Sequence, residues 1–524
     1  MAASVDESAT PRRDLRAQAL AAPSHPAIVC GERRLSYAEL EALANRIAGL
    51  LRGLGLQRGD HIASLLGNRP EALAVAWGAY RCGLYLTPLA TTLSAAEAAY
   101  LVGDCEARLV ISEAALRSLA EPLCRNAAGG VHWLAFDGPL AGFTPIEPLI
   151  AAAAPTPHAD EPPGALMVYT SGTTGAPKGV HRPLPPADFR GTPAFAADLH
   201  ALFGLGRPDV RYLSTAPLYH AAPLRFALAV TAGGGTVHVM DRFDAEAALR
   251  LLEQHAITHS QWVPTMFQRL LALPAERRLA FHAPHHRVAV HGAAPCPVNV
   301  KRAMINWWGP ILLEYYSGSE GIGLTLINSD ESLGRPGSVG RARKGVIHIA
   351  DSTGNEVPAG RTGVIYFSGV TPFAYYKAPE KTAAKTTAQG WQTFGDMGHV
   401  DAEGWLYLTD RLDDMIISGG VNLYPQEIEA ALLDAPGVRE CVVVGVADEQ
   451  FGERPVAFIV PAREATGDPA ALLDAIRAHA ESRLGRLKRP REIHLIDELP
   501  RTATGKVLRR VLRDRLGPLN PRSP

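Results

Sequence analysis

Residues 169–180 read YTSGTTGAPKGV, and they directly follow an apolar, β-prone run at residues 165–168. Glycines let the backbone turn through positive φ and bring N–H groups close to an anion, while hydroxyls and a lysine add donors and charge. The composition therefore predicts a loop that holds a phosphate chain. The residues expected to bind there are Thr170, Ser171, Gly172, Thr173, Thr174, Gly175 and Lys178.

The spacing of this loop is not that of a Walker A motif. A P-loop needs Gly-Lys-Ser/Thr in succession, whereas here Pro177 precedes Lys178 and Gly179 follows it. This excludes a P-loop kinase, and the glycines alone would indicate only a turn. The whole string resembles the phosphate loop of the adenylate-forming, AMP-binding superfamily, which includes acyl-CoA synthetases, peptide-synthetase adenylation domains and firefly-type luciferases. The resemblance implies a catalytic role for Thr174.

The overall composition is that of a large globular protein. With 524 residues the chain exceeds what one hydrophobic core normally serves, so two or more domains are expected. The formal net charge of −1 gives no field that would attract nucleic acid. The six cysteines follow no CxxC or Cys/His metal spacing, which indicates reduced thiols in a cytoplasmic protein. The most apolar stretch, residues 72–86, is broken by Arg81 and is too short to span a bilayer.

Short β-rich runs alternate with Ala/Leu-rich stretches of helical spacing. Helices are expected at 40–55, 71–83 and 113–119, and strands at 61–68 and 108–111. Such alternation predicts an α/β fold with largely parallel sheets. Pro-rich segments at 153–163 and 182–193 are expected to be exposed connections.

Two further strings resemble the nucleotide-binding motifs of the same superfamily. One is the adenine loop, here Gly292, Ala293, Ala294 and Pro295. The other, Tyr316-Ser317-Gly318-Ser319-Glu320, is similar to the family's Tyr-Gly-x-Thr-Glu. The resemblance implies that Tyr316 stacks on adenine, that the Ser319 hydroxyl contacts the α-phosphate, and that Glu320 binds Mg²⁺. Ser317 replaces the usual Gly, which stiffens the turn, and Ser319 replaces Thr, which keeps the hydroxyl.

Residues 390–429 carry the densest resemblance to the superfamily. Asp396 and Arg411 match the residues that hold the ribose hydroxyls, and Phe394 stands where relatives usually have Thr or Ser. Asp413 matches the hinge of a small C-terminal domain. Gly419 and Gly420 resemble the pair that lines the thiol tunnel for CoA.

Residues 500–506 resemble the family's Pro-x-Thr-x-x-Gly-Lys, whose lysine bridges the acyl carboxylate and the α-phosphate. This implies a catalytic role for Lys506, although a lone lysine is otherwise a surface residue. The implied organisation is a large multi-subdomain N-terminal domain, residues 1–410, with mostly parallel sheets. A small mobile α+β domain, residues 411–524, would carry the catalytic lysine.

The sequence says least about which carboxylic acid would be the substrate. Residues 217–220 (PLYH) resemble the segment that gates the acyl site, with His220 as a catalytic and pocket residue where amino-acid-activating relatives place an Asp. An ammonium group would lack its counter-charge there, and burying it unpaired is costly. Ala221, Trp262 and Tyr315 are the other expected pocket residues, which favours a hydrophobic acid, whether fatty, aryl or a steroid side-chain acid.

The resemblance implies an acyl-CoA synthetase that uses ATP, Mg²⁺ and CoA and acts on a hydrophobic carboxylic acid. Two alternatives remain: an enzyme that loads a separate carrier protein, and a non-catalytic nucleotide-binding regulator. A regulator would be expected to lose Lys506 or Glu320, and both are present. No nucleic-acid partner or transmembrane segment is expected. Peripheral membrane contact and the choice between monomer and homodimer stay open.

Overall fold

Six described strands form a wholly parallel sheet in the order β7-β6-β5-β3-β4-β8. The computed structural model describes residues 14–127, 129–170, 177–189, 191–351, 353–419, 421–462, 468–501 and 507–516. A helix connects each pair of successive strands except β6 and β7, which are joined by residues 137–143. The strands are β3 (His61–Ser64), β4 (Tyr85–Pro88), β5 (Ala107–Glu113), β6 (His132–Phe136), β7 (Thr144–Pro145) and β8 (Ala165–Leu166), and the helices α3 (Pro70–Arg81), α4 (Ala95–Asp104), α5 (Arg117–Asn126) and α6 (Glu147–Ala152).

A second sheet contains thirteen described strands, in the order β18-β19-β21-β22-β17-β16-β15-β14-β13-β11-β12-β1-β2. Its central run from β1 to β15 is parallel. The strands are β1 (Pro26–Cys30), β2 (Arg33–Ser36), β11 (Arg211–Ser214), β12 (Thr236–Val239), β13 (His259–Trp262), β14 (Val288–His291), β15 (Leu312–Tyr316), β16 (Leu324–Asn328), β17 (Ser338–Lys344), β18 (Val346–Ala350), β19 (Gly363–Ser368), β21 (Asp396–Val400) and β22 (Leu406–Arg411).

From β15 to β18 in this order, neighbouring strands are antiparallel. The expectation of largely parallel sheets therefore holds for the six-stranded sheet and for only part of the thirteen-stranded sheet. The reason is the length of the connections. The link between the paired strands β21 and β22, residues 401–405, is too short for the crossover that a parallel pair needs. The helices of this region are α7 (Ala194–Phe203), α8 (Ala221–Gly233), α9 (Ala245–Gln254), α10 (Pro264–Leu271), α11 (Ala275–Ala280), α12 (Val298–Trp308), α13 (Ser329–Gly334) and α14 (Pro379–Ala383).

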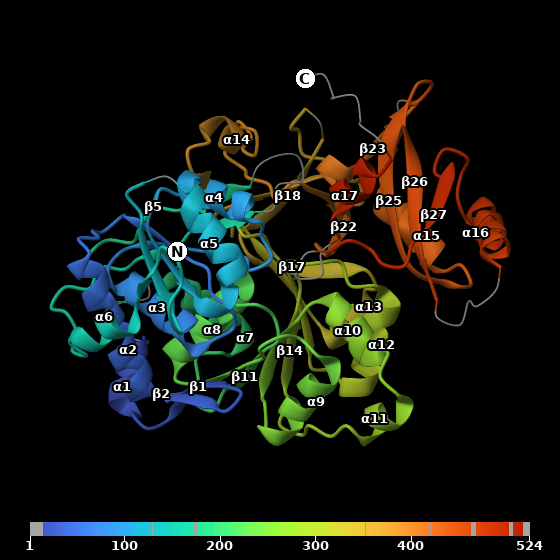
Figure 1. The fold of residues 1–524 in the computed structure, drawn as a ribbon. Helices are drawn as coiled ribbons and strands as arrows, with labels where there is room; N and C mark the ends of the chain where they lie inside the picture. Colours follow the sequence, from blue (N-terminus) through green and yellow to red (C-terminus); the bar gives the residue numbers. More distant parts are fainter. Residues whose placement is uncertain are drawn as a thin grey trace, which may run out of the picture.

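A smaller unit follows β22 and lies on the right of Figure 1, in orange and red. After the short 3₁₀ turn η3 (Leu412–Asp414) the chain forms its own mixed sheet with its own buried core. The elements are β23 (Ile416–Ser418), β24 (Val421–Leu423), β25 (Val438–Asp448), β26 (Gly452–Pro461), β27 (Glu492–Leu495), α15 (Pro425–Leu433), α16 (Pro469–Arg483) and α17 (Arg509–Asp514). The last strand of the large sheet ends at Arg411, the residue at which the sequence places the start of a second domain.

Local capping explains where several helices begin. Helix α2 (Tyr37–Gly53) starts three residues before the expected range because Ser36 and Glu39 form a capping box. The expected helix at 113–119 is wrong at its start: Glu113 still belongs to β5, and a 3₁₀ turn (Ala114–Leu116) precedes α5.

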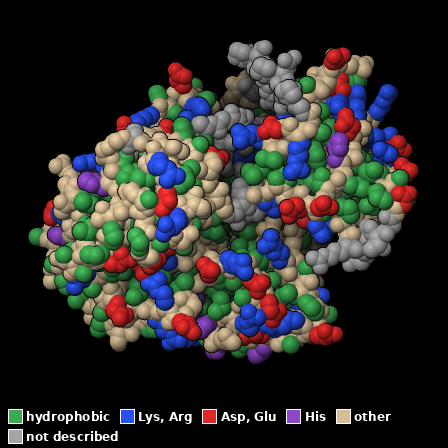
Figure 2. Space-filling view, viewed as in Figure 1, with side chains coloured by type: hydrophobic (Ala, Val, Ile, Leu, Met, Phe, Trp, Pro, Cys, Tyr) green, Lys and Arg blue, Asp and Glu red, His purple; other side chains and the backbone are tan. Residues whose placement is uncertain are grey.

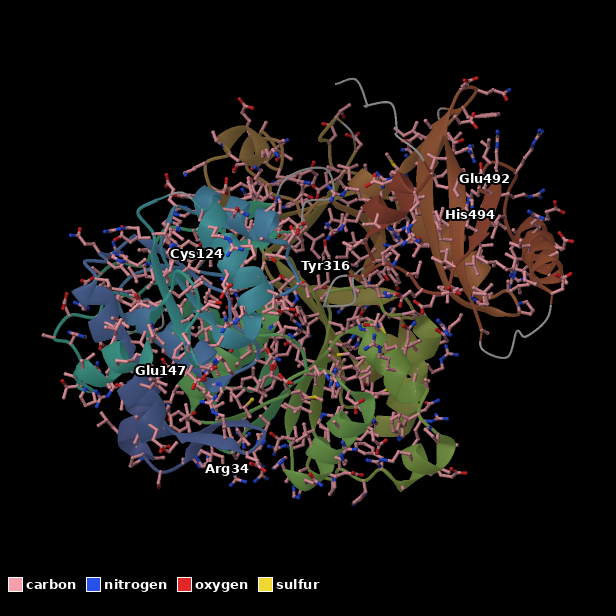
Figure 3. All side chains as sticks on the ribbon, in the orientation of Figure 1. Arg34, Cys124, Glu147, Tyr316, Glu492 and His494 are labelled. Carbon is pink, nitrogen blue, oxygen red and sulfur yellow. The ribbon has the colours of Figure 1, made fainter. Side chains whose placement is uncertain are left out.

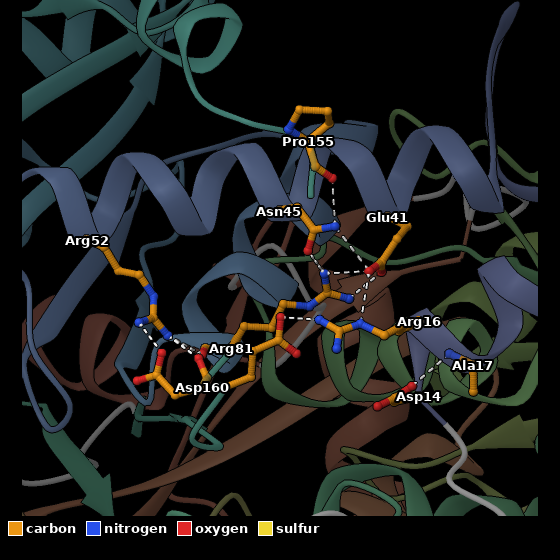
Figure 4. Close-up of polar contacts among 10 residues, drawn as sticks. Asp14, Arg16, Ala17, Glu41, Asn45, Arg52, Arg81, Pro155 and Asp160 are labelled. Carbon is orange, nitrogen blue, oxygen red and sulfur yellow. Dashed lines mark hydrogen bonds and ion pairs between the residues drawn. The ribbon is translucent and has the colours of Figure 1, made fainter. Parts of the chain in front are cut away.

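A buried ionic network fixes α1 (Leu15–Ala21), α2 and α3 against one another (Figure 4). Arg81, at the end of α3, donates to Asn45 and to both carboxylate oxygens of Glu41 on α2. Arg16 of α1 pairs with the same Glu41 and with Glu161. Removing one member would leave a buried charge unpaired, which costs about 3–5 kcal/mol.

The surface carries charges of both signs. On the face turned to the reader in Figure 2, Lys and Arg side chains alternate with Asp and Glu rather than forming one large patch of a single sign. Among the described residues, no helix is both long and apolar enough to cross a membrane.

Candidate active site

A chain of polar contacts joins three residues that are far apart in sequence. The Tyr316 hydroxyl donates to Asp396 Oδ2 at 2.7 Å, and Arg411 Nε lies 2.9 Å from Asp396 Oδ1. Antiparallel pairing of β21 with β22 sets Asp396 directly opposite Arg411. The result is an aromatic ring beside a carboxylate and a guanidinium, near the centre of the molecule where Figure 3 labels Tyr316. A planar base and a vicinal diol fit such a set.

The turn after β15 packs tightly on Phe394. A Cβ on Gly318 would lie 2.4 Å from the Phe394 ring and 2.7 Å from Glu320 Oε2, so only glycine fits there. The Phe394 ring meets Tyr316 edge-on at a centroid distance of 5.6 Å. Ser317 Oγ donates to the Gly323 carbonyl at 2.7 Å and so closes the turn. Phe394 thus fills space beside the ring where relatives were expected to have a small hydroxyl residue.

Glu320 is 7% exposed and is held at two points. Tyr375 donates its hydroxyl to Oε1 at 3.0 Å, and Arg182 Nη2 donates to the Glu320 backbone carbonyl at 2.6 Å. Among the described residues no hydrogen-bond donor reaches Oε2. No cluster of three His, Cys, Asp or Glu side chains able to hold a metal occurs in the described chain. A carboxylate oxygen without a donor in the described chain nevertheless fits Mg²⁺, which commonly takes one or two carboxylates and completes its shell with phosphate and water.

The loop after β14 is strained and close-packed. Ala293 has φ +69°, a left-handed conformation that a residue with a Cβ seldom adopts. A Cβ on Gly292 would lie 2.7 Å from the Tyr315 carbonyl oxygen. Ala294 and Pro295 follow in the same partly exposed loop. Backbone strain of this kind is typical of ligand-binding loops.

The glycine-rich loop joins two paired strands. In the small sheet β9 (Val168–Thr170), β10 (Lys178–His181) and β20 (Ala374–Tyr375), Thr170 lies opposite Lys178. The Lys178 ammonium is 3.4 Å from the Tyr100 hydroxyl. Ser171, Gly172, Thr173, Thr174 and Gly175 lie outside the described residues, so their expected phosphate contacts stay a prediction.

His220 caps the start of α8. Its ring packs on Tyr219 at a centroid distance of 4.6 Å, and Nε2 has no hydrogen-bond partner in the described part of the chain. Burial lowers the pKa of His220 to about 4, so the imidazole is neutral at neutral pH. Ala221 follows in the first turn of α8 and packs against the same hydrophobic cluster as Tyr316.

Tyr315 and Trp262, both expected to line the acyl pocket, lie on opposite faces of the sheet. Trp262 stands in register with His291 and then Glu314, and Tyr315, the next residue on β15, points the other way. Trp262 is 1% exposed, and its ring packs on Phe243, Phe267 and Trp308. Trp262 therefore packs into the core on the face away from Tyr315, and its expected role in the acyl pocket stays a prediction.

Gln261, the neighbour of Trp262, lies on the Tyr315 side instead. Its Nε2 donates to the Tyr315 hydroxyl at 3.4 Å, and the Tyr212 hydroxyl donates to its Oε1 at 3.2 Å. The Tyr315 ring also meets Phe203 and Phe226, at centroid distances of 5.9 and 6.2 Å. Sequence reasoning missed Gln261, together with Arg182, Tyr375 and Arg225. Of these, only Arg225 carried a sequence signal, as a charge inside an apolar helix.

In the smaller unit, Gly419 turns the β23–β24 hairpin with φ +57°, and its N–H donates to the Phe451 carbonyl at 2.7 Å. Asp413 lies in η3, between the large sheet and the smaller one. Gly420, Lys506 and the side chain of Asp413 fall outside the described residues. The hinge, tunnel and lysine assignments therefore remain predictions.

Comparisons with known proteins cover nearly the whole chain. The family model described as AMP-binding enzyme matches residues 15–377, and that described as AMP-binding enzyme C-terminal domain matches residues 427–506. An indoleacetate–CoA ligase from Aromatoleum aromaticum is 33% identical, covering 93% of this chain and 94% of that protein. The long-chain-fatty-acid–CoA ligase FadD13 from Mycobacterium tuberculosis is 32% identical, covering 93% and 94%.

Among solved structures, ATP-bound MatB from Rhodopseudomonas palustris superimposes with a TM-score of 0.79. It is 29% identical, and the match covers 98% of this chain and 97% of that one.

Proposed function

Because the chain belongs to the AMP-binding enzyme family, whose members are AMP-forming acid–thiol ligases, we propose that it converts a hydrophobic carboxylic acid to an acyl-adenylate and then to a CoA thioester. The observation that carries this proposal is the Tyr316–Asp396–Arg411 chain beside the Glu320 carboxylate. It offers a ring for adenine, an acceptor and a donor for the ribose diol, and a hard oxygen next to the phosphates.

The first step joins two anions. The substrate carboxylate attacks the α-phosphate of ATP, an acyl–phosphate bond forms, and pyrophosphate leaves. Bound on Glu320, Mg²⁺ would supply positive charge to the phosphate oxygens. The proposed loop donors, Ser171 to Gly175 with Lys178, and the proposed Lys506 would offset the rest of the charge. Removing one such preorganised donor typically costs about 10²–10³ in rate.

In the second step, the CoA thiol must reach the acyl-adenylate at the site that Lys506 occupies in the first step. We propose that residues 411–524 rotate about Asp413, which withdraws Lys506 and brings the Gly419–Gly420 turn to the site. The CoA thiol, losing its proton, then attacks the acyl carbonyl, the thioester forms and AMP leaves. Glycines at that turn leave room for the pantetheine arm.

The pocket supports an acid whose acyl part is largely apolar. Phe203 and Phe226 meet the Tyr315 ring, and Ala221 packs against the cluster that also contacts Tyr316. Burial of such apolar surface contributes about 25 cal/mol per Å². A neutral His220 offers no counter-charge to an ammonium group. The two relatives named above, which act on indoleacetate and long-chain fatty acids, agree with this chemistry.

A matched pair of acids tests the proposal. With ATP, Mg²⁺ and CoA, 3-phenylpropionate should release pyrophosphate and form a thioester, and phenylalanine should be a poor substrate. Activity should rise with apolar length from about six carbons until the pocket is full. Preference for phenylalanine or for acetate would contradict the apolar site. Adenylation without transfer to CoA would favour loading of a carrier protein, and no acid-dependent turnover would favour the non-catalytic regulator.

A further inference from the structure

One charged side chain interrupts the otherwise apolar helix α8. Residues 221–233 read AAPLRFALAVTAG, and Arg225 is the one ionisable residue in that helix. Its neighbours Leu224 and Phe226 are buried in the core. An arginine is rarely buried unless it is paired, so its position calls for a partner.

The described part of the protein does not supply that partner. Within the described chain, no hydrogen bond or ion pair is formed by the Arg225 guanidinium, which retains some accessible surface. Desolvation, together with the nearby charge of Arg182, lowers the pKa of Arg225 to about 10. A partner from outside the described chain would have to occupy the space beside this partly exposed side chain.

The groups around Arg225 identify that space as the acyl side of the site. Besides Arg182, the ionisable groups that influence it are Tyr315 and Glu320. Tyr315 is the pocket tyrosine that bonds Gln261, and Glu320 already accepts from Tyr375. A Mg²⁺ ion on Glu320 would remove the compensating negative charge. The surroundings of Arg225 therefore carry positive charge and hydrogen-bond donors, and they lie between apolar rings.

Arg225 lies deeper than the proposed reaction centre. It follows Ala221, which packs against the same hydrophobic cluster as Tyr316, by one helical turn, or about 6 Å along the axis. Tyr315, with which it is associated, points to the opposite face of β15 from Tyr316. The reacting carboxylate must stay near the nucleotide, so a different group of the substrate would reach Arg225.

We propose that Arg225 is a specificity-determining residue that binds a second oxyanion on the acyl part of the substrate, so that the preferred acids are apolar acids with a further carboxylate at their distal end. This rests on the proposed function. A planar guanidinium matches a carboxylate in a bidentate pair, and Gln261 and Tyr315 provide additional hydrogen-bonding groups beside it.

Two pairs of acids that differ only in the second carboxylate provide the test: 3-(4-carboxyphenyl)propionate against 3-phenylpropionate, and heptanedioate against heptanoate. The wild type should favour the diacid by about 10–100-fold in kcat/KM for pyrophosphate release. Arg225→Leu should reverse this preference, and Arg225→Lys should retain part of it. Arg250→Leu, on the exposed face of α9, is the matched control and should not change the ratio.

Each outcome decides the question. Equal losses for diacid and monoacid in Arg225→Leu would mean that Arg225 holds the reacting carboxylate, which overturns the proposal. Thioester formation from the monoacids with poor use of both diacids would overturn it and leave the proposed function intact. No turnover of any acid would overturn both. Should Arg225→Leu fail to fold, a larger rise in wild-type Tm with diacid than with monoacid, both with AMP present, would support the proposal, and the reverse would overturn it.

Discussion

The Tyr316 hydroxyl and Asp396 Oδ2 lie 2.7 Å apart and join β15 to β21 across 80 residues of sequence. Arg411 contacts the other carboxylate oxygen of Asp396, Oδ1. Each of the three residues is therefore oriented before any ligand arrives, because Asp396 is held from both sides. Preorganisation of this kind lowers the cost of ordering a nucleotide on binding.

Loss of the tyrosine hydroxyl should weaken ATP binding selectively. Tyr316→Phe keeps the ring for stacking but removes the hydrogen bond to Asp396, and bonds to charged groups contribute about 1.5–3 kcal/mol. KM for ATP should rise about tenfold or more, with a smaller effect on KM for the acid. Tyr407→Phe is the control because that hydroxyl contacts only Asp401, at 3.5 Å. Equal changes in both variants would contradict the assignment.

Adding one methyl group at Gly318 should disrupt the turn. The new Cβ would lie 2.4 Å from the Phe394 ring, so Gly318→Ala should destabilise the protein by about 1–3 kcal/mol and reduce adenylation strongly. Gly334→Ala, where a Cβ meets nothing within 4 Å, should be tolerated. Thermal unfolding and pyrophosphate release measure the two effects. Wild-type behaviour of Gly318→Ala would show that the turn is looser than its packing indicates.

Asp410 makes stability depend on pH. The side chain is 2% exposed, and burial raises its pKa from the ordinary 3.8 to about 6. Since the folded state holds the proton more tightly than the unfolded state, this group lowers stability as pH rises from about 4 to 6. At 1.36 kcal/mol per pKa unit the loss is about 3 kcal/mol.

The Asp410→Asn variant isolates this effect because asparagine does not titrate. The Tm of the wild type minus that of the variant should fall between pH 4.5 and 6.5 and stay constant above. A difference that is flat across this range, or that grows with pH, would exclude a raised pKa for Asp410.

The fold could be read from the sequence where local patterns determine it. Alternating strands and helices before residue 160 indicated the α/β class, and the glycine-rich string indicated the loop between β9 and β10. The antiparallel half of the large sheet could not be read in this way, because strand direction depends on connection lengths rather than on residue pattern. The early start of α2 depends on the Ser36–Glu39 capping box, which the apolar periodicity does not register.

The residues of the candidate site could also be predicted only in part from the sequence. Tyr316, Asp396 and Arg411 were each visible as motif letters, but their contact depends on the β21–β22 register. Gln261 could not be identified from the sequence, because a four-residue strand that is buried throughout gives no alternation from which to assign its faces. Arg225 was missed although it is a charge among apolar residues, because its proposed role depends on the packing of α8 against Tyr315.

Fixing the backbone at Asp413 should separate the two half-reactions. Asp413→Pro holds φ near about −65° and should restrict rotation of residues 411–524. Acyl-adenylate formation should continue while thioester formation falls at least about tenfold. The adenylation rate of the same sample is the internal control. Wild-type rates in both halves would exclude rotation about this residue.

The most direct measurement follows the nucleotide products with 3-phenylpropionate, CoA, Mg²⁺ and ATP labelled at the α-phosphate. We expect acid-dependent formation of AMP and pyrophosphate in equal amounts, with one thioester per AMP. Lys506→Ala should lose formation of the adenylate but still convert a supplied acyl-adenylate to the thioester. Formation of ADP and phosphate, or turnover of ATP that does not depend on the acid, would contradict an AMP-forming ligase.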